Sequence, residues 1–600
     1  MRRLNFDAVV IGGGHSGIEA SYILSKAGFS VALVTQKKDF IGRMSCNPSI
    51  GGVGKGHLVR EIDALGGLMA KVADKTGIQF RILNSSKGAA VQGLRCQSDR
   101  KRYSQEAIMA LSAFKNLEII EGEAASIEAS SSVKGVWLED GTFLKTKYAV
   151  IAAGTFLRGK LFTGMSVKEG GRIGEPPSKS LSISLEKLGI PLSRLKTGTP
   201  ARLKRDSINY EILEKQEGDK IPEPFSLFSS PFPVLPQECC HITYTTNRTK
   251  EVVHKYLDKS PLFQGLIKGV GPRYCPSLED KIVKFPHHER HQVFIEPDGA
   301  DSDLVYPNGI STSLPVEAQD EFIRTIPGLE EAEVVTYGYA VEYDFLQPTN
   351  LTFDLSLRGI EGLYFAGQVI GTTGYEEAAG LGLYAAYNII KKLNKKEPFR
   401  LQRSESYLAV MVEDLVLKGV LEPYRLFTSR AEYRMLLDRH TAYRRLSKYA
   451  EEENLISENE KLLRDEWENT FNKWAQTLKK SKTKGGTCFD AVKRESSLDD
   501  SLLNRFPIDN PFMKNYLFSE IRNEGYRKRF ADEARKLETA LCVKIPKDFD
   551  YKKISGLSRE MVERLSAAKP ETLLSASRIP GVTPAALSLL RIEIEKRRKK

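Results

Sequence analysis

A glycine-rich turn near the start of the chain is the feature that most constrains its fold. Two short apolar runs rich in β-branched residues, 6–11 and 30–35, flank a segment of helical periodicity, and Gly12, Gly14 and Gly17 lie between the first run and that helix. Glycine at these places permits a tight turn, close approach of the backbone to a pyrophosphate, and close helix–strand packing. The unit therefore predicts dinucleotide binding. The turn consists of Gly12, Gly13, Gly14, His15, Ser16 and Gly17.

The end of the second strand departs from the pattern that such turns usually show. An Asp or Glu there normally bonds the ribose hydroxyls of the dinucleotide. Here the strand ends in Thr35, Gln36 and Lys37, and the amide of Gln36 can bond a ribose only more weakly. The departure concerns how the adenosine end is held, not whether a dinucleotide binds.

Two later segments favour FAD over a nicotinamide cofactor. Segment 148–156 is an apolar strand ending in Ala-Gly-Thr, and 362–386 is a strand, a glycine-rich turn and a helix beginning near Tyr375. A chain that returns so late to complete its first domain resembles the two-part FAD domain of the glutathione-reductase-like flavoproteins. Those proteins usually place an Asp at the ribityl chain where this sequence has Gln368, and the dipole of the following helix can stabilise an anionic reduced flavin.

Length and patterning predict several domains. At roughly 100–200 residues per domain, 600 residues give three or four. Prolines and mixed strands replace the βαβ pattern over 200–340, and long charged stretches with helical spacing follow 395. The predicted fold class is α/β: a glutathione-reductase-like FAD-binding Rossmann domain with an inserted α/β domain and an all-helical C-terminal domain. The predicted boundaries are 1–199 and 341–395 for the two parts of the FAD-binding domain, 200–340 for the inserted domain, 396–540 for a helical domain and 541–600 for a small helical subdomain.

Composition argues against several classes of protein. Hydrophobic residues make up 41% of the chain and charged residues 28%, and no run approaches about 18 uncharged apolar residues, so we expect neither general disorder nor a membrane span. The seven cysteines are odd in number and have no C-x-x-C spacing, which favours a reducing, cytoplasmic compartment over disulfides or structural zinc. The first residues enter a strand at once, so we expect neither a signal peptide nor a transit peptide.

The charge of the chain is a mild indication of a polyanionic partner. The 89 basic and 77 acidic residues give a net charge of +12. Half of it lies between Leu537 and Lys600, where 14 Lys and Arg face 8 Asp and Glu. A nucleic-acid surface and a solvated tail are equally compatible with this segment. Within it, Thr583 before Pro584 fits the N-terminus of a helix.

Segment 44–67 contains a phosphate-loop look-alike and a candidate cysteine. Lys55 lies between two glycines, but the first Gly of a Walker A motif and the Ser or Thr after its Lys are both missing, so we reject a nucleoside triphosphate site. Cys46 precedes this glycine-rich stretch. Near a flavin and before a helix N-terminus its pKa would be lowered, although the residues alone favour a buried structural cysteine.

A second candidate cysteine, Cys275, lies between Tyr274 and Pro276. The neighbouring Arg273 would favour a thiolate and is also suited to holding a phosphate. Three histidines follow at 287, 288 and 291, but their spacing lacks the Glu of a zinc-protease motif and prolines interrupt any helix, so we predict no metal site.

Six segments together closely resemble the MnmG (GidA) family of bacterial enzymes that modify tRNA wobble uridine with a 5-carboxymethylaminomethyl group. They are SCNPSIGGVGKGHL, RLKTGTPAR, GPRYCPSLEDKIVKF, GLYFAGQVIGTTGYEEAAGLG, FTSRAEYRMLL and ASRIPGVTPAAL, and the resemblance runs from about residue 5 to 592. It implies a homodimeric FAD protein that acts on tRNA with a partner GTPase, MnmE. It also implies a carbon from 5,10-methylene-tetrahydrofolate, nitrogen from glycine or ammonium, and NADH as a reductant of the flavin.

The resemblance also assigns residues. The family's catalytic cysteines fall on Cys46 and Cys275, and its FAD site falls on the turn 12–17 and on Ala124, Ser178 and Gln368. We expect tRNA contacts at Arg273 and Arg434, and contacts of 541–600 with tRNA or the GTPase. The family's proposed NAD-binding stretch falls on Gly271, Pro272, Arg273, Tyr274, Pro276, Ser277, Leu278, Glu279, Asp280, Lys281, Ile282, Val283, Lys284 and Phe285.

The proposed chemistry explains the need for two thiols. Uracil C5 is a poor nucleophile until a thiolate adds at C6, and a base must later remove the C5 proton. We favour Cys275 as nucleophile, because a loop beside Arg273 suits a flipped uridine. Which cysteine plays which role is left open.

One departure and two alternatives accompany this reading. The family's acidic Asp-Asn-Ala-Asp run is replaced at 438–443 by Asp-Arg-His-Thr-Ala-Tyr, so contacts with tRNA or a second subunit are expected to differ there. The alternatives are a folate- and FAD-dependent tRNA methyltransferase that makes ribothymidine, which lacks the helical region 396–600, and a non-catalytic flavoprotein assembly factor.

Overall fold

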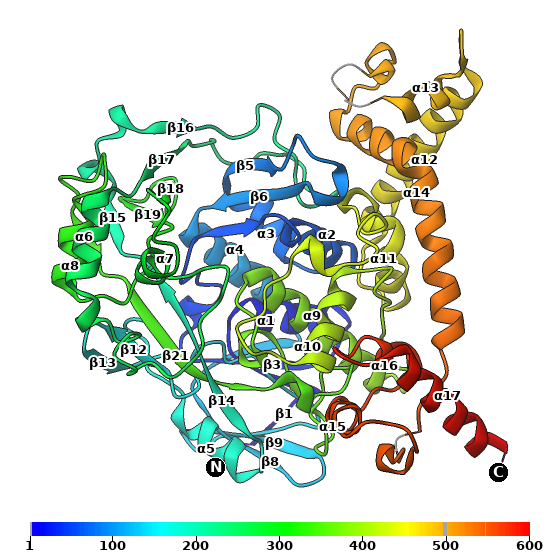
Figure 1. Ribbon diagram of the computed structural model, residues 1–600, viewed down its shortest axis with the longest axis horizontal. Coiled ribbons are helices and arrows are strands. Elements are labelled where there is room, and N and C mark those ends of the chain that lie inside the picture. The colour runs from blue at the N-terminus through cyan, green and yellow to red at the C-terminus, as the bar shows by residue number, and fades with distance from the viewer. Residues whose placement is uncertain (1–2, 496–497, 499–500, 547, 600) are drawn as a thin grey trace.

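The centre of the protein is a parallel five-stranded sheet built from both ends of the predicted FAD-binding domain. A computed structural model describes residues 3–495, 498, 501–546 and 548–599, so Lys547 and Lys600 of the basic C-terminal segment lie outside it. The chain enters the sheet at its start and returns to complete it at 363–365, as predicted (Figure 1). In order across the sheet the strands are β22 (Leu363–Phe365), β11 (Ala149–Ile151), β2 (Ala8–Ile11), β3 (Val31–Thr35) and β7 (Leu117–Glu121).

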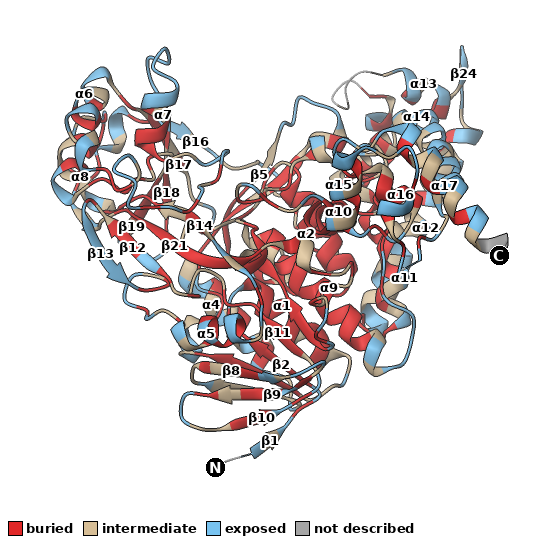
Figure 2. Ribbon diagram, turned by 60° about the horizontal axis from the view of Figure 1, so that its bottom comes forward, coloured by how far each residue is buried: buried red, intermediate tan, exposed pale blue. Residues whose placement is uncertain are grey.

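Helices and smaller sheets cover this central sheet. The helix α1 (His15–Lys26) packs against α9 (Tyr375–Leu393), and both are largely buried together with the strands (Figure 2). A four-stranded sheet contains β1 (Arg3–Asn5), β10 (Phe143–Lys145), β9 (Val133–Leu138) and β8 (Ala124–Ala129), with α5 (Lys179–Lys187) against β8. A three-stranded sheet contains β4 (Ser49–Gly51), β6 (Gly93–Ser98) and β5 (Gly77–Leu83), beside α2 (Lys55–Ala64), α3 (Met69–Thr76) and α4 (Arg100–Ser112).

Two long antiparallel strands lead the chain out of this body and back. They are β14 (Leu192–Thr199) and β21 (Tyr339–Leu346), which pair along their whole length, and β12 (Lys160–Thr163) and β13 (Ser166–Glu169) extend their sheet. Because the outgoing and returning strands are neighbours, most of the chain between residues 199 and 339 forms a projection, seen at the left of Figure 1. The loop around Phe225 returns to the main body and packs in its core.

The projection has its own sheet and its own core. Its buried side chains, among them Leu203, Ile295 and Phe322, form a cluster separate from that of the central sheet. The sheet contains β16 (Glu214–Gln216), β17 (Cys240–Tyr244), β18 (Gln292–Pro297), β19 (Leu304–Asn308), β15 (Arg202–Lys204) and β20 (Val334–Thr336). Its helices are α6 (Asn247–Lys255), α7 (Leu278–Lys284) and α8 (Val316–Ile323).

The C-terminal region is mostly helical within the described residues. A two-stranded hairpin of β23 (Lys482–Thr483) and β24 (Gly486–Thr487) interrupts it, so the prediction of an all-helical region was wrong at this turn, where Gly486 adopts φ +130°. The helices are α10 (Tyr407–Lys418), α11 (Ala442–Glu452), α12 (Glu458–Lys480), α13 (Cys488–Arg494), α14 (Pro511–Leu541), α15 (Arg559–Ala568), α16 (Leu573–Ser577) and α17 (Pro584–Lys599).

The end of the chain packs back onto the main body. The 31-residue helix α14 carries the chain along one side of the molecule, α15 and α16 then return toward α10, and α17 extends outward at the lower right (Figure 1). Leu565 and Leu590 belong to the same continuous cluster of buried side chains as the central sheet. The helix α17 begins at Pro584, and the hydroxyl of Thr583 accepts a hydrogen bond from the backbone N–H of Ala586, as the sequence predicts.

Candidate cofactor and thiol site

The glycine turn has the local geometry that its sequence predicts. Gly12 adopts φ +113°, and a Cβ there would overlap the carbonyl oxygen of Ala152. A Cβ on Gly17 would overlap the carbonyl oxygen of Gly12, so this glycine lets α1 start directly against the strand. A Cβ on Gly14 would meet no protein atom within 4 Å. Gly14 therefore faces open space, and only a bound ligand would restrict a side chain there.

A cavity lies beyond the carboxyl ends of β2, β3, β11 and β22, as expected for a ligand site of an open α/β sheet. Most residues of the predicted FAD site line it. The lining includes Gly12, Gly13, Gly14, His15, Ser16, Ala124, Ser178 and Gln368. Of that set, Gly17 does not line the cavity and acts through helix packing instead.

Three buried polar atoms in the lining have no hydrogen-bond partner within the described residues. They are Nε2 of His15, Oγ of Ser16 and Oε1 of Gln36. Leaving such groups unsatisfied costs free energy, so they fit a ligand with polar groups along its length. Burial lowers the pKa of His15 to about 3, so its imidazole is neutral at pH 7.

Gln36 and Gln368, which the sequence indicates as ligand contacts, both line the cavity. The Nε2 of Gln36 donates to the carbonyl of Pro176 at 3.1 Å, which leaves its Oε1 free to accept from a ribose hydroxyl. The Nε2 of Gln368 donates to the Tyr343 hydroxyl at 3.2 Å. The residues present therefore fit a dinucleotide such as FAD.

Lys55 has a structural role that agrees with the rejection of a phosphate loop. Its Nζ lies 2.8 Å from Glu376 and 2.9 Å from Glu377, both in the first turn of α9. All three side chains are buried, so the lysine ties α2 to the start of α9. The N-terminus of α9 faces the cavity, because Gly374 and Tyr375 are among its lining residues.

Cys46 and Cys275 line the same cavity as the glycine turn, although they are 229 positions apart in sequence. Cys46 is half-buried and Cys275 is exposed. This convergence was not visible in the sequence, because it depends on how the projection folds back over the central sheet.

The expected environment of Cys46 was wrong in two respects. The helix after it starts only at Lys55, with β4 in between, so no helix N-terminus follows Cys46 directly. Burial raises the pKa of the Cys46 thiol, with Cys275 acting in the same direction, where a lowered pKa was expected. Cys46 is therefore a thiol at pH 7 in the resting protein.

Side chains of the projection hold the Cys46 loop. The Tyr306 hydroxyl lies 2.9 Å from Cys46 Sγ, and Arg202 donates to the carbonyls of Ser45 and Cys46 at 3.1 and 3.2 Å. From the other side, the Cys46 backbone N–H donates to the hydroxyl of Tyr375 at 2.9 Å. Sequence analysis missed both residues: Tyr306 lies in none of the quoted motifs, and Arg202 ends the motif RLKTGTPAR without any sign that it contacts Cys46.

The predicted NAD-binding stretch divides into a loop at the cavity and a helix away from it. Within 271–285 only Pro272 and Cys275 line the cavity. Leu278 and Ile282 belong to the core of the projection, and buried Glu279 accepts hydrogen bonds from the backbone and side chain of Ser313. Most of this stretch therefore supports the loop and does not face the cavity.

The exposed side of the Cys275 loop carries an aromatic ring and positive charge. Tyr274 is 56% exposed, its ring packs edge-on to that of Phe427 at 4.6 Å, and the Arg273 guanidinium lies 5.9 Å from the Tyr274 ring. Arg425 lines the cavity and donates to the Tyr274 carbonyl at 3.4 Å. Arg434 is exposed and does not line the cavity.

The segment that departs from the family pattern lies inside the protein. Asp438, Arg439 and Tyr443 are buried, and Arg439 pairs with Glu223 at 3.2 Å. The Tyr443 hydroxyl bonds buried Asp63. The expected change of an outer surface at 438–443 was therefore wrong for these side chains, which join the helical region to the body.

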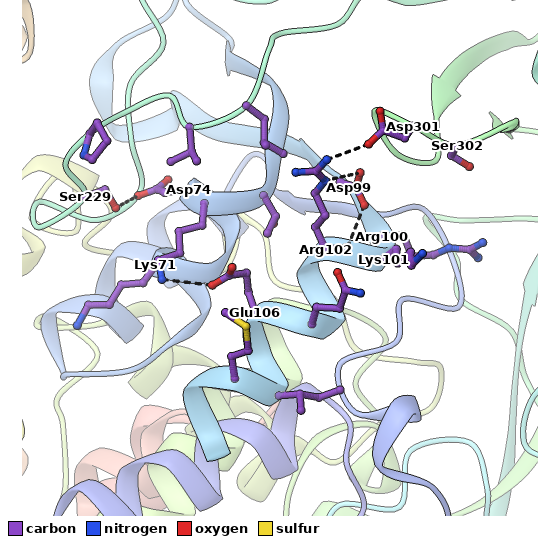
Figure 3. Close-up of a pocket in the computed structure, with 18 of the residues that line it drawn as sticks. Lys71, Asp74, Asp99, Arg100, Lys101, Arg102, Glu106, Ser229, Asp301 and Ser302 are labelled. Atoms are coloured by element: carbon purple, nitrogen blue, oxygen red, sulfur yellow. Dashed lines mark hydrogen bonds and ion pairs between the residues drawn. The ribbon is translucent and has the colours of Figure 1, made fainter. Parts of the chain in front are cut away.

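A second, larger hollow lies between α3, α4 and the loop around Ser229 (Figure 3). Several of its charged groups already have partners: Arg102 pairs with Asp301 at 2.8 Å, and Asp74 accepts a hydrogen bond from the hydroxyl of Ser229 at 2.6 Å. Arg100 is likewise paired with Asp298. This hollow contains neither candidate cysteine nor the glycine turn, so we do not assign the chemistry to it.

The described residues contain neither a metal-binding cluster nor a helix that could span a membrane. No group of three or more His, Cys, Asp or Glu side chains is arranged to hold a metal ion within the described ranges. Among the helices of that same part of the chain, none has the length and apolar character needed to cross a membrane.

Comparison with known proteins gives the same picture along almost the whole chain. The family described as glucose inhibited division protein A matches residues 7–397, and the tRNA modifying enzyme MnmG/GidA C-terminal helical bundle matches 533–600. The chain is 44% identical to the tRNA uridine 5-carboxymethylaminomethyl modification enzyme MnmG of Thermodesulfovibrio yellowstonii, over 99% of this chain and 98% of that one. It is 45% identical to the protein of the same name from Aquifex aeolicus, over 98% of each.

Solved structures agree with the fold described above. Aquifex aeolicus GidA in its form I crystal has a TM-score of 0.91 and 45% identity, covering 98% of this chain and 100% of that one. The form II crystal gives 0.90 and 43%, covering 98% of both chains. The predicted fold class, α/β with a helical C-terminal region, is confirmed.

Proposed function

The chain belongs to the GidA family, and on this premise we propose that it is an FAD-dependent enzyme that modifies C5 of the wobble uridine in certain tRNAs. The added group is carboxymethylaminomethyl or aminomethyl. The observation that carries the proposal is that Cys46 and Cys275 face one cavity with the glycine turn.

The cofactor part of the proposal rests on the cavity lining. The turn Gly12–Ser16 would hold the pyrophosphate of FAD, Gln36 a ribose, and Gln368 the ribityl side. When bound, FAD supplies redox chemistry that no side chain of this protein can perform. NADH as reductant, 5,10-methylene-tetrahydrofolate as carbon donor and glycine or ammonium as nitrogen donor follow from the family resemblance.

The protein's own residues supply the thiol chemistry. We assign Cys275 as the nucleophile at uracil C6, because its sulfur is exposed beside Arg273 and Arg425 where a polyanion can approach. Cys46, half-buried and protonated at rest, takes the second role: once it has given up its own proton, its thiolate removes the proton from C5. Tyr274 offers a ring on which a flipped base can stack.

The assembly part of the proposal comprises a homodimer, the partner GTPase MnmE and tRNA, acting in the cytoplasm. The segment 541–600, with its excess of basic residues, is the proposed contact for tRNA or the GTPase.

Nucleoside analysis of tRNA from a strain lacking this protein tests the proposal. We expect the wobble-uridine modification to disappear and to return with the wild-type gene. A strain that keeps the modification in full would contradict the assigned reaction.

The cysteine roles are tested by complementation with Cys46→Ser and Cys275→Ser. Each variant should fold and bind FAD but fail to restore the modification, because a serine alkoxide forms far less readily than a thiolate. Stability should change by about 1 kcal/mol or less. With tRNA containing 5-fluorouridine, Cys275→Ser should form no covalent adduct and Cys46→Ser should keep some. The reverse pattern would exchange the roles, and full activity of either variant would remove that cysteine from the mechanism.

A further inference from the structure

Within the described part of the chain, the Cys46 sulfur has one side-chain hydrogen-bond partner, the hydroxyl of Tyr306. The two atoms lie 2.9 Å apart, and the tyrosine comes from β19 of the projection, whereas Cys46 precedes β4 of the main body. Tyr306 is only 2% exposed, so water does not compete for its hydroxyl. The contact therefore joins the two parts of the molecule at a proposed reacting atom.

A cation reinforces this contact from the neighbouring strand. The Arg202 guanidinium on β15 lies 4.4 Å from the centre of the Tyr306 ring, and β15 pairs with β19. Arg202 also donates to the carbonyl of Cys46, which fixes the loop that carries the sulfur. A positive charge over a phenol ring favours the hydroxyl as a donor and stabilises an anion beyond it.

We infer that Tyr306 is a positioning residue that holds the Cys46 sulfur toward the cavity and donates a hydrogen bond to its thiolate whenever Cys46 gives up its proton. The inference gains its catalytic meaning from the function proposed above. It assigns to the projection, through Tyr306 and Arg202, control of the ionisation of a thiol in the other part of the molecule.

The other groups around Cys46 do not replace this hydroxyl. Tyr375 on α9 accepts from the Cys46 backbone N–H, and Tyr339 on β21 accepts from the N–H of Ile173. Cys275 lies across the cavity and Arg172 lines it. Burial and Cys275 raise the pKa of Cys46, while the Tyr306 hydrogen bond and Arg202 act in the opposite direction.

The test is the pH dependence of iodoacetamide alkylation of Cys46 in the FAD-loaded full-length protein, followed by peptide mass spectrometry. Tyr306→Phe should move the midpoint upward by about one pH unit, which slows alkylation about tenfold at a given pH below the midpoint. Tyr339→Phe is the matched control, because it removes a buried hydroxyl from the same cavity without touching the sulfur, and its midpoint should equal that of the wild type.

Other results have distinct meanings. An unchanged midpoint in Tyr306→Phe, or faster alkylation at every pH, would overturn the inference, since simple loosening exposes the sulfur without changing its acidity. If Tyr306→Phe does not fold, 4-aminophenylalanine at position 306 keeps the shape and replaces the O–H by a weaker N–H donor that does not ionise in the alkaline range, so the midpoint must move up. The alkylation measurement needs no tRNA, so it tests the role of Tyr306 independently of the proposed reaction. The proposed reaction is tested by the nucleoside analysis.

Discussion

The glycines of the turn have two different roles: Gly14 leaves room for a ligand, and Gly17 allows the helix to pack against the strand. A side chain on Gly14 would point into open cavity, whereas one on Gly17 would overlap the carbonyl of Gly12. The same type of residue therefore serves two purposes within four positions. Among the glycines of this turn, only Gly12 has a positive φ.

Gly14→Val and Gly17→Ala should consequently fail in different ways. Gly14→Val should fold normally and purify without flavin, because its side chain occupies the place of the pyrophosphate. Gly17→Ala should lower the unfolding temperature, because α1 must move away from β2. Absorbance at 450 nm and thermal unfolding measure the two effects. Full flavin occupancy in Gly14→Val would remove the basis of the cofactor assignment.

A buried histidine makes stability depend on pH. His57 on α2 is fully buried, its ring packs edge-on to Tyr407 at 5.2 Å, and neither ring nitrogen has a hydrogen-bond partner within the described residues. Burial lowers its pKa from 6.5 to about 3, and Arg439 and Arg445 act in the same direction against Asp438. The folded state therefore binds fewer protons than the unfolded state between these two values.

The contribution of neutral His57 to the free energy of unfolding should be fully present above pH 6.5 and be lost as the pH falls from 6.5 toward 3. From pH 7 to pH 5 this group should remove about 2 kcal/mol. His57→Phe keeps an aromatic ring and cannot be protonated, so its unfolding temperature should fall less over the same interval. Equal falls for the wild type and His57→Phe would contradict this account.

At the scale of elements, one buried ion pair ties the C-terminal helices to the body. Arg578, which follows α16, pairs with Glu413 on α10, and the two side chains are 14% and 10% exposed. Arg403 beside them pairs with Asp414 at 2.9 Å and Glu432 at 2.8 Å. Within the described residues, removing Arg578 leaves Glu413 one ion-pair contact, at 3.8 Å with Arg403.

Arg578→Ala should therefore loosen α15 to α17 while the central sheet stays intact. Breaking such a buried pair costs about 3 kcal/mol, whereas an exposed pair contributes about 1 kcal/mol or less. Arg591→Ala is the control, because its partner Glu595 is 52% exposed on the same helix. Hydrogen exchange at residues 573–597 should rise in Arg578→Ala only. Equal exchange in the two variants would show that apolar packing alone holds the segment.

At the scale of the whole molecule, the end of the chain is separable from the cofactor cavity. The helix α14 ends at Leu541, and no residue beyond Arg425 lines that cavity within the described ranges. A chain ending at Cys542 should bind FAD but fail to restore tRNA modification in cells. If the missing contact is the GTPase, pull-down fails while tRNA binding remains; if it is tRNA, affinity and its salt dependence both fall. Unchanged modification would show that the basic segment is only solvated surface.

Local sequence determined the elements that short-range rules control. The strand–glycine–helix unit, the return of the chain at 362–386 and the start of α9 at Tyr375 follow from hydrophobic periodicity and from where glycine is required. The six sequence motifs were enough to predict the family and to propose Cys46 and Cys275 as the catalytic cysteines. The hairpin β23–β24 was missed because two-residue strands leave no periodicity to detect.

Tertiary structure alone decided the surroundings of those residues. Tyr306 and Arg202 reach Cys46 only because β14 and β21 place the projection against the main body, and no local pattern records a contact 260 positions apart. The direction of the Cys46 pKa followed from burial, which sequence proximity to glycines could not reveal. The departure at 438–443 was expected to change contacts with tRNA or a second subunit, but ion pairs with distant Glu223 and Arg527 hold this segment inside the protein. The local sequence thus determined where the glycine turn and the two cysteines lie in the chain. Long-range packing determined the protonation state of Cys46 and the side chains that contact it.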